Sequence, residues 1–355
     1  MKFEVYNYQC SPAEWTEGNL FSDEARKYRE EALKAMINHL AIIDSLLTNE
    51  KTPYPMGANS SFPFKEDNTL YLMRPRTRKP KNASPALQNA LNSPYLRARL
   101  LYAEESFYVL TVQNKSILNK EINWEKSSML NMPSCIVIIA NTEGRQLLLV
   151  EDNQAFYDTK TVVKIFQNTL RIMLRPRKLN ITFRPHYNST SFWQHMKKKY
   201  LKGIGLRSVK FYFDYPNMAQ DAKLLGTFLK EFSEEMNAES QYTITGQHGQ
   251  SLNINPQKPD PNLASIIEYA GKTGNKLQVV YCDKSRYTYD AEHVGISSLE
   301  ATKQIEGWIK NWVREMLEGQ RQTLTEQYDK SEFHSHLTNF LNGLEEGTDS
   351  RPFGK

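Results

Sequence analysis

Residues 135–150, CIVIIANTEGRQLLLV, contain two short apolar runs, 135–140 and 146–150, on either side of the turn-forming residues 141–144. Two such runs joined by a turn that contains Asn and Gly are typical of a β-hairpin. We therefore expect an antiparallel sheet in this part of the chain, with a further strand over residues 107–112.

Helical and strand patterns alternate after the hairpin. The sequence predicts helices over 159–174, 190–200, 218–236 and 262–270, and strands over 179–183, 208–213, 242–245 and 276–282. This order favours an α+β fold, in which a mixed or antiparallel sheet carries packed helices. A C-terminal amphipathic helical segment completes the predicted fold, with Trp308 and Trp312 on its apolar stripe.

Four regions follow from these patterns. The N-terminal region, residues 1–155, is predicted to be α+β and to contain a first strand, a long helix from Ser22 to about residue 49, a basic Pro-rich loop and the hairpin. Residues 156–296 form a basic α/β region, residues 297–342 form the C-terminal helices, and residues 343–355 form a disordered tail. The long helix is expected to begin at Ser22 because Asp23 and Glu24 follow it, where carboxylates complement the helix dipole.

Composition excludes several classes of protein. At 39% hydrophobic and 24% charged residues the chain is typical of a folded globular protein. Its apolar runs are far shorter than the roughly 18 residues that a membrane span needs, and no secretory signal is visible, so a cytoplasmic protein without membrane contact is expected. Three separated cysteines predict neither a disulfide framework nor a zinc site, and no cofactor is expected.

Charge is distributed unevenly along the chain. Between Asp158 and Asp214 there is no acidic residue, whereas thirteen Lys and Arg residues occur there. A second window without acids, between Asp67 and Glu104, carries seven cations, which include Arg74, Arg76, Arg78 and Lys79 in the Pro-rich loop. Because the whole chain has a net charge of only +5, the remainder is strongly acidic. Such segregation predicts a basic surface that attracts a polyanion.

The predicted helix over 159–174 separates cations from apolar residues. At 100° per residue, its four cations from Lys160 to Arg175 fall within about 60° of one another, and Val162, Phe166 and Met173 lie on the opposite side. Solvent-exposed helix faces usually mix both signs of charge, so a purely cationic face favours polyanion binding over simple solvation.

Aromatic residues accompany the cations between 183 and 213. Rings beside cations suit the stacking of unpaired bases, but core packing is the favoured alternative for each of them, since Phe and Trp are usually buried. On the strand over 208–213, alternation places Val209 and Phe211 on one face and Lys210, Tyr212 and Asp214 on the other, where they are positioned to contact a ligand.

The leading hypothesis is a nucleic-acid-binding protein that contacts phosphates and does not read sequence. We expect DNA or RNA to be bound by the following cations: Lys160, Lys164, Arg171, Arg175, Arg177, Lys178, Arg184, Lys197, Lys198, Lys199, Lys202 and Lys210, with Arg74, Arg76, Arg78 and Lys79 adding nonspecific affinity.

Two alternatives remain open. Acids at predicted strand ends, namely Glu151 or Asp152, Asp214 and Asp283, would form the Mg²⁺ site of a metal-dependent nuclease if they clustered, although Asp commonly begins a turn after a strand. In the other alternative, the protein is an assembly subunit that docks on an acidic protein and self-associates through Trp308 and Trp312, although the favoured interpretation of this apolar stripe is that the helix covers the sheet of its own chain.

A resemblance supports the nucleic-acid hypothesis. The order strand, strand, helix, strand over residues 135–184, the pair Phe192-Trp193, and the run FYFDYPN over residues 211–217 resemble bacterial proteins of anti-phage defence islands, similar in layout to the DNA-binding subunit of the Kiwa system. This resemblance implies a cytoplasmic antiviral defence component that handles phage nucleic acid or a complex bound to it.

Overall fold

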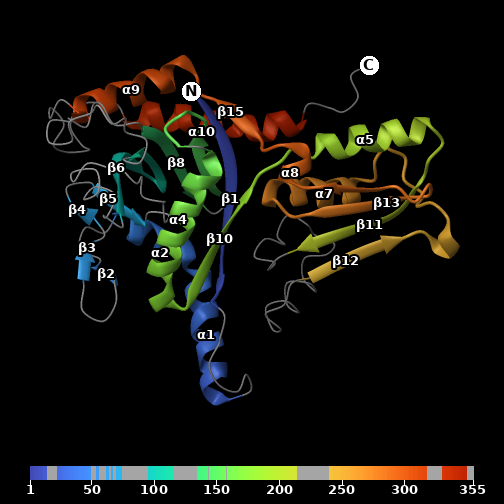
Figure 1. The fold of residues 1–355 in the computed structure, drawn as a ribbon, viewed down its shortest axis with the longest axis horizontal. Coiled ribbons are helices and arrows are strands. Elements are labelled where there is room, and N and C mark those ends of the chain that lie inside the picture. The colour runs from blue at the N-terminus through green and yellow to red at the C-terminus, as the bar shows by residue number, and fades with distance from the viewer. Residues whose placement is uncertain are drawn as a thin grey trace, which may run out of the picture. The chain divides into compact units, whose positions relative to one another are not determined.

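The protein has an α+β fold, as the sequence predicts (Figure 1). The computed structural model describes residues 1–13, 22–48, 53–55, 61–63, 65–66, 69–73, 95–114, 134–142, 144–156, 158–213, 240–317 and 330–349. The chain divides into two compact units. Unit 1 comprises Met1–Glu4, Tyr8–Phe183 and Leu299–Phe340, and unit 2 comprises Val5–Asn7, Arg184–Ser298 and Leu341–Lys355.

A nine-stranded sheet forms the centre of unit 1. Its strand order is β10-β1-β9-β8-β7-β6-β5-β4, and β15 also pairs with β1. The bounds are β1 (Lys2–Pro12), β4 (Lys65–Glu66), β5 (Thr69–Met73), β6 (Tyr95–Glu104), β7 (Phe107–Gln113), β8 (Ser134–Thr142), β9 (Arg145–Glu151), β10 (Leu179–Pro185) and β15 (Ser298–Glu300), and a separate pair is formed by β2 (Pro53–Pro55) and β3 (Ser61–Pro63). The predicted hairpin is confirmed, because β8 and β9 pair antiparallel with Val137 opposite Val150.

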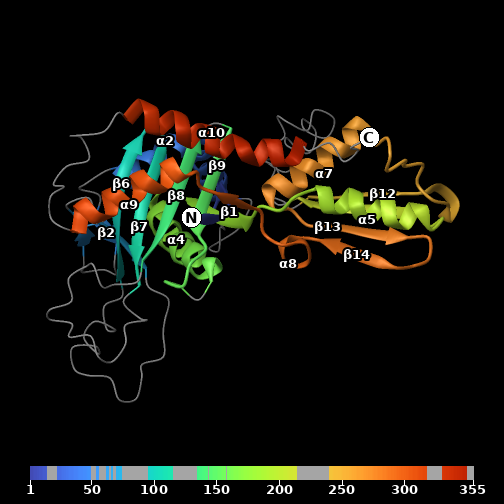
Figure 2. The ribbon, with the colours of Figure 1, turned by 90° about the horizontal axis from the view of Figure 1, so that it is seen from above.

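Helices cover both faces of this sheet, which is why β7 is buried along its whole length. The described helices of unit 1 are α1 (Asp23–Ile37), α2 (His39–Thr48), α4 (Thr159–Leu174), the short 3₁₀ turn η2 (Arg175–Arg177), α9 (Lys303–Leu317) and α10 (Lys330–Asp349) (Figures 1 and 2). Unit 1 includes α10 only up to Phe340. Trp312 of α9 stacks on Tyr102, which pairs with Val109, whereas Asp44 of α2 accepts a hydrogen bond from the neighbouring Tyr108. Adjacent residues of a strand point to opposite faces, so α9 and α2 cover opposite sides of the sheet.

The predicted long N-terminal helix is divided in two. Its start is as expected, because the Ser22 hydroxyl accepts a hydrogen bond from the backbone N–H of Ala25 at 3.2 Å. At Asn38 the backbone leaves the helical conformation and donates its N–H to the carbonyls of Ala35 and Met36, which ends α1 before α2 begins. The apolar periodicity continues across this break, and this explains why the pattern predicts a single helix.

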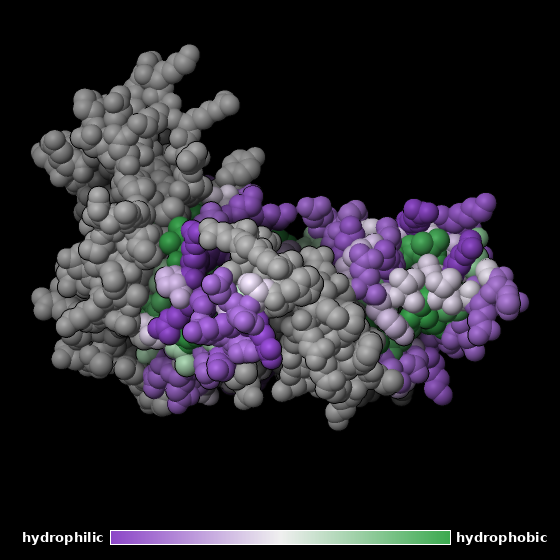
Figure 3. Space-filling view, turned by 90° about the horizontal axis from the view of Figure 1, so that it is seen from below, coloured by the Kyte–Doolittle hydropathy of each residue, from purple (hydrophilic) through white to green (hydrophobic). Residues whose placement is uncertain are grey.

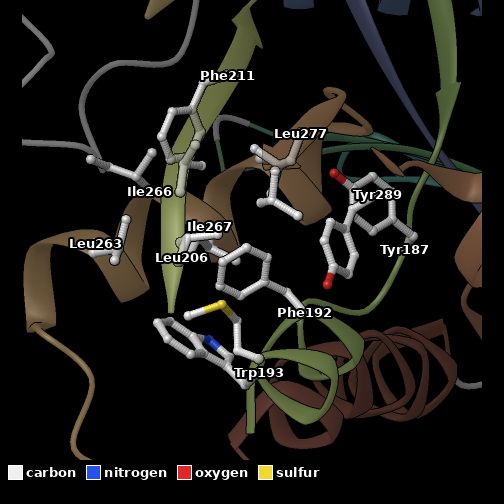
Figure 4. Close-up of a cluster of buried hydrophobic side chains, with 14 of the residues drawn as sticks. Tyr187, Phe192, Trp193, Leu206, Phe211, Leu263, Ile266, Ile267, Leu277 and Tyr289 are labelled. Atoms are coloured by element: carbon white, nitrogen blue, oxygen red, sulfur yellow. The ribbon is translucent and has the colours of Figure 1, made fainter. Parts of the chain in front are cut away.

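Unit 2 contains a four-stranded antiparallel sheet with the order β12-β11-β13-β14. Its elements are α5 (Thr190–Leu201), β11 (Leu206–Phe213), β12 (Ser240–Thr245), the 3₁₀ turn η3 (Gln247–Gly249), α7 (Pro261–Thr273), β13 (Leu277–Tyr281), β14 (Arg286–Tyr289) and α8 (Ala291–Val294). Helices α5 and α7 contribute Phe192, Trp193 and Ile267 to one apolar core with Val209 and Phe211 of β11 (Figure 4). Both helices therefore cover the same face of the sheet.

A β-bulge sets the register of β11. Leu206 pairs with Tyr281, but Ser208 already pairs with the adjacent Val280, so Arg207 is the extra residue on its strand. The bulge lets Leu206 and Val209 both face the core, and it leaves Ser208, Lys210 and Tyr212 on the opposite side. The predicted alternation from Val209 to Tyr212 is confirmed.

The boundary between the units differs from the predicted one near residue 155. Helix α4 packs against β5 and β9, and β10 pairs with β1, so both elements belong to unit 1 up to Phe183. At the C-terminus, α9 packs against β6 of unit 1, and α10 continues to Asp349 within the segment predicted to be a disordered tail. None of the described helices is long and apolar enough to cross a lipid bilayer.

Candidate nucleic-acid interface

Helix α4 has the two faces that its sequence predicts. Asp158 begins the helix by accepting a hydrogen bond from the N–H of Thr161 at 2.6 Å. The apolar residues of the predicted core face, among them Val162 and Phe166, are buried, whereas Lys160 and Lys164 are exposed. The cationic side of α4 is therefore a solvent-facing surface of unit 1.

Four exposed cations of α4 and of the turn η2 that follows it have no anionic partner among the described residues. Within the part of the chain that the structure describes, no carboxylate lies within 4.0 Å of Lys160, Lys164, Arg175 or Arg177, and all four side chains are exposed. We call these four residues the α4 cations. Lys160 and Arg175 are about 22 Å apart along the helix, at 1.5 Å per residue. This distance corresponds to roughly six base pairs of duplex, at 3.4 Å per phosphate of each strand.

The other two predicted cations between residues 160 and 178 make contacts within the fold. Arg171 is half-buried and donates its Nε–H to the carbonyl of Ile181 in β10 at 2.9 Å. Lys178 forms an ion pair with Glu31 of α1, and its Nζ lies 4.9 Å from the centre of the Tyr28 ring. The ammonium group of Lys178 lowers the pKa of Glu31. Both side chains therefore hold unit 1 together and are less available to a ligand than the α4 cations.

In unit 2 the basic residues are also divided between free and engaged side chains. Lys198 and Lys202 are exposed near the end of α5. Lys199 instead binds Asp283 at 3.0 Å and the hydroxyl of Ser285 at 2.8 Å. Consecutive residues of a helix point in different directions, so the predicted basic segment does not act as one surface.

Three further predicted cations belong to this unit, and one of them, Lys210, lies on β11. Lys197 is exposed, and Arg184 donates from Nη1 to Oδ1 of Asn275 at 2.7 Å. Arg184 thus joins β10 to the loop after α7. The predicted cations Arg74, Arg76, Arg78 and Lys79 lie outside the described residues.

The aromatic residues near the cations are core residues with few exceptions. Tyr187, Phe192 and Trp193 are buried in the apolar core of unit 2 (Figure 4), which confirms the core alternative for them. Tyr212 differs because it projects from the other face of β11 and is only half-buried. It is the aromatic residue of this strand that is placed to meet a ligand.

We call that second side of the unit 2 sheet the open face. It consists of the residues that alternate with the core positions: Ser208, Lys210, Tyr212, Gln241, Thr243, Thr245, Gln278, Val280, Arg286 and Thr288. None of these residues is buried, and none is acidic. In Figure 1 helices α5 and α7 lie above the sheet, and the view from below in Figure 3 shows a surface of unit 2 with hydrophilic residues around nearly neutral and apolar ones.

Sequence reasoning missed Lys276 as a member of this site. The Nζ of Lys276 lies 5.7 Å from the centre of the Tyr212 ring, and its carbonyl accepts the N–H of Tyr212 at 3.0 Å. A signal was present, because the apolar residues Leu277 and Val279 alternate with Lys276 and Gln278 in the sequence. That alternation assigns Lys276 to the same side as Gln278.

The acids predicted for a nuclease site have structural contacts. Glu151 accepts hydrogen bonds from the N–H of Ile136 and from Asn153, both at 2.9 Å, and burial raises the pKa of Glu151. Asp152 lies 3.5 Å from the ammonium of Lys2. Both acids are in unit 1 and hold the end of β9 in place.

Asp283 belongs to unit 2 and closes the turn between β13 and β14. It accepts hydrogen bonds from the side chain of Ser285, from Lys199 and from the backbone N–H of Ser285, and these contacts lower the pKa of Asp283 to about 2. Asp214 lies outside the described residues. Among the residues that are described, no three His, Cys, Asp or Glu side chains gather as metal ligands would.

The apolar stripe of α9 is used within unit 1. Trp312 is buried, and its ring stacks on that of Tyr102 with 5.7 Å between centroids. Trp308 contacts Phe333 and His336 of α10 edge to face. The favoured interpretation, that this helix covers the sheet of its own chain, is confirmed for Trp312, and burial of Trp312 leaves it no place in a self-association surface.

No protein-family model matches the chain, and a search of curated proteins finds no similar sequence.

Proposed function

We propose that the protein binds nucleic acid through the phosphate backbone, with the α4 cations as the contact surface in unit 1. The observation that carries this proposal is that none of the described carboxylates pairs with any of these four exposed side chains. Exposed Lys and Arg side chains without ion pairs break no ion pair of the protein when they bind phosphates. Their binding also releases condensed counterions from the nucleic acid, which favours association.

The contacts predict nonspecific binding. A row of cations on a helix surface reaches phosphate oxygens, which carry no sequence information. If all four α4 cations contact duplex phosphates, the logarithm of affinity falls with the logarithm of salt concentration with a slope of about −3.6. Arg171 and Lys178 are not counted, because they bind Ile181 and Glu31.

Charge reversal of the α4 cations tests this proposal. We expect the triple variant Lys164→Glu, Arg175→Glu and Arg177→Glu to lose about 10²- to 10³-fold in affinity for duplex DNA at about 0.1 M salt, because three phosphate contacts are removed. The salt slope should fall to about −0.9. Fluorescence anisotropy over a salt series measures both quantities.

A matched control separates this local effect from net charge. The triple variant Lys27→Glu, Lys303→Glu and Arg314→Glu makes the same change of charge on exposed positions of α1 and α9 in unit 1. It should keep the slope of the unaltered protein. An equal loss of affinity in both variants would contradict a role for the α4 cations, and a complete lack of binding by the unaltered protein would favour docking on an acidic protein.

We further propose a role in anti-phage defence, which rests on the resemblance of residues 135–184, 192–193 and 211–217 to defence-island proteins. This role predicts that cells carrying the gene reduce the plating efficiency of phages, and that the α4 triple variant abolishes this protection. Full protection by the triple variant would separate defence from binding at α4.

A further inference from the structure

The open face of unit 2 presents an aromatic ring in a fixed position. Tyr212 of β11 donates a hydrogen bond from its hydroxyl to Oε1 of Gln278 in β13 at 3.4 Å, and its backbone N–H is bonded to Lys276. Gln278 belongs to β13 and Lys276 directly precedes this strand, so one neighbouring segment holds both the hydroxyl and the backbone of Tyr212. Its side chain remains half exposed.

Two ammonium groups accompany this ring. The Nζ of Lys210 lies 4.8 Å from the centre of the Tyr212 ring, and that of Lys276 lies 5.7 Å from it. Each lysine has a long flexible side chain, so a phosphate group can draw its ammonium away and leave a ring face to a base. The site thus combines an aromatic surface for stacking with charge for the adjacent backbone.

The rest of the open face is compatible with a polyanion. Its described positions contain no carboxylate, and Arg286, at the far edge on β14, adds an exposed cation. The strand pairs place the neutral side chains of Thr243 and Gln278 on either side of Lys210. An anionic chain can therefore cross the sheet without meeting a like charge at these positions.

The combination of features favours one class of ligand. The carboxylates of an acidic protein would use the lysines but not the flat ring of Tyr212. In a duplex the faces of the bases are stacked on one another and are unavailable to a side chain. Unpaired bases expose their faces, and stacking on an aromatic residue tolerates any sequence.

We infer that the open face of unit 2 is a second nucleic-acid site, specific for single strands, in which Tyr212 stacks on an unpaired base while Lys210 and Lys276 bind the flanking phosphates. This inference goes beyond the proposed function, because it concerns another unit and another form of nucleic acid. The two share only the premise that the protein binds nucleic acid.

Substitution of Tyr212 tests the inference. We expect Tyr212→Ala to weaken binding of labelled oligo(dT) or oligo(U) by about 5- to 150-fold, which is the effect of losing one stacked base. Tyr212→Phe keeps the ring and should retain most of the affinity. Binding of a duplex of the same length should be unchanged by either substitution, and the oligo(dT) and oligo(U) arms show whether DNA or RNA is preferred.

Tyr242→Ala is the matched control. Tyr242 is an exposed tyrosine of the same sheet, but it pairs with Phe211, with 6.2 Å between ring centroids, and so lies on the opposite side from Tyr212. Its loss should leave single-strand affinity unchanged. Unaltered single-strand affinity in Tyr212→Ala, or an equal loss in Tyr242→Ala, would overturn the inference.

The outcomes also distinguish this inference from the proposed function. Duplex binding that depends on the α4 cations, without single-strand binding that depends on Tyr212, would leave the proposed function standing and reject the second site. The reverse result would reject the α4 surface alone. If Tyr212→Ala does not fold, Lys210→Ala and Lys276→Ala replace it, and each should make the salt slope for single strands less steep by about 0.7. Unchanged slopes would reject the site.

Discussion

His186 is a buried histidine whose imidazole Nδ1 lies 2.8 Å from the hydroxyl of Ser297. Burial lowers the pKa of His186 from 6.5 to about 4, and the positive charge of Lys272 acts in the same direction. The folded protein therefore holds the neutral ring at pH values at which the unfolded chain is already protonated. The contribution of His186 to the free energy of unfolding is fully present above about pH 6.5 and is lost as the pH falls toward 4.

The size of this effect follows from the difference between the two pKa values, which corresponds to roughly 3 kcal/mol. An NMR titration of the imidazole should give a pKa near 4. The variant His186→Gln should show a weaker decrease of unfolding free energy between pH 7 and pH 4 than the unaltered protein. Parallel pH profiles for the two proteins would rule out this role of His186.

The connection from α7 to β13 depends on Gly274, which ends the helix with a left-handed φ of +68°. A Cβ at this position would lie 2.6 Å from the carbonyl oxygen of Pro185 and 2.7 Å from the Cβ of Arg184. We expect Gly274→Ala to destabilise unit 2 by about 2–5 kcal/mol, from the left-handed backbone together with the displaced neighbours. Urea unfolding measures this loss.

Gly203 provides the control for that substitution. It has a φ of +71°, but nothing lies within 4 Å of the position that a Cβ would occupy. Gly203→Ala should therefore lower the free energy of unfolding by about 1–2 kcal/mol, which is the cost of the left-handed backbone conformation alone. If both alanine variants lose the same stability, the close approach of Pro185 to Gly274 has no energetic consequence.

Elements with a strong local pattern could be predicted from the sequence, whereas partners from distant segments could not. The two faces of α4 follow from the angular spacing of Lys160 and Val162, and the structure has them as expected. The partners of Lys178 and Lys199 lie 147 and 84 residues away, at Glu31 and Asp283. No local pattern contains that information. The face of a helix on which cations lie can therefore be predicted from the sequence, but which of them form ion pairs with distant segments cannot.

At the scale of the whole molecule, the segment without acids between Asp158 and Asp214 is divided between two units. Residues up to Phe183 belong to unit 1, and residues from Arg184 belong to unit 2. Residues that are contiguous in the sequence are therefore distributed over two compact units. Each unit carries its own candidate site, the α4 cations in unit 1 and the open face in unit 2, and the two sites differ in chemistry.

This difference predicts that salt discriminates between the two sites. The α4 cations bind through charge alone, so raising salt from about 50 to about 200 mM should weaken duplex binding about 150-fold at a slope of about −3.6. The open face offers Lys210, Lys276 and Arg286, and each contact of these residues with a phosphate contributes about −0.7 to the salt slope. The same change in salt should therefore weaken single-strand binding by about 7- to 20-fold, because stacking on Tyr212 does not depend on salt. Parallel salt titrations with duplex and single-stranded ligands measure both slopes in the unaltered protein. Preference should shift toward single strands as salt rises, and equal slopes would mean that one ionic surface binds both forms.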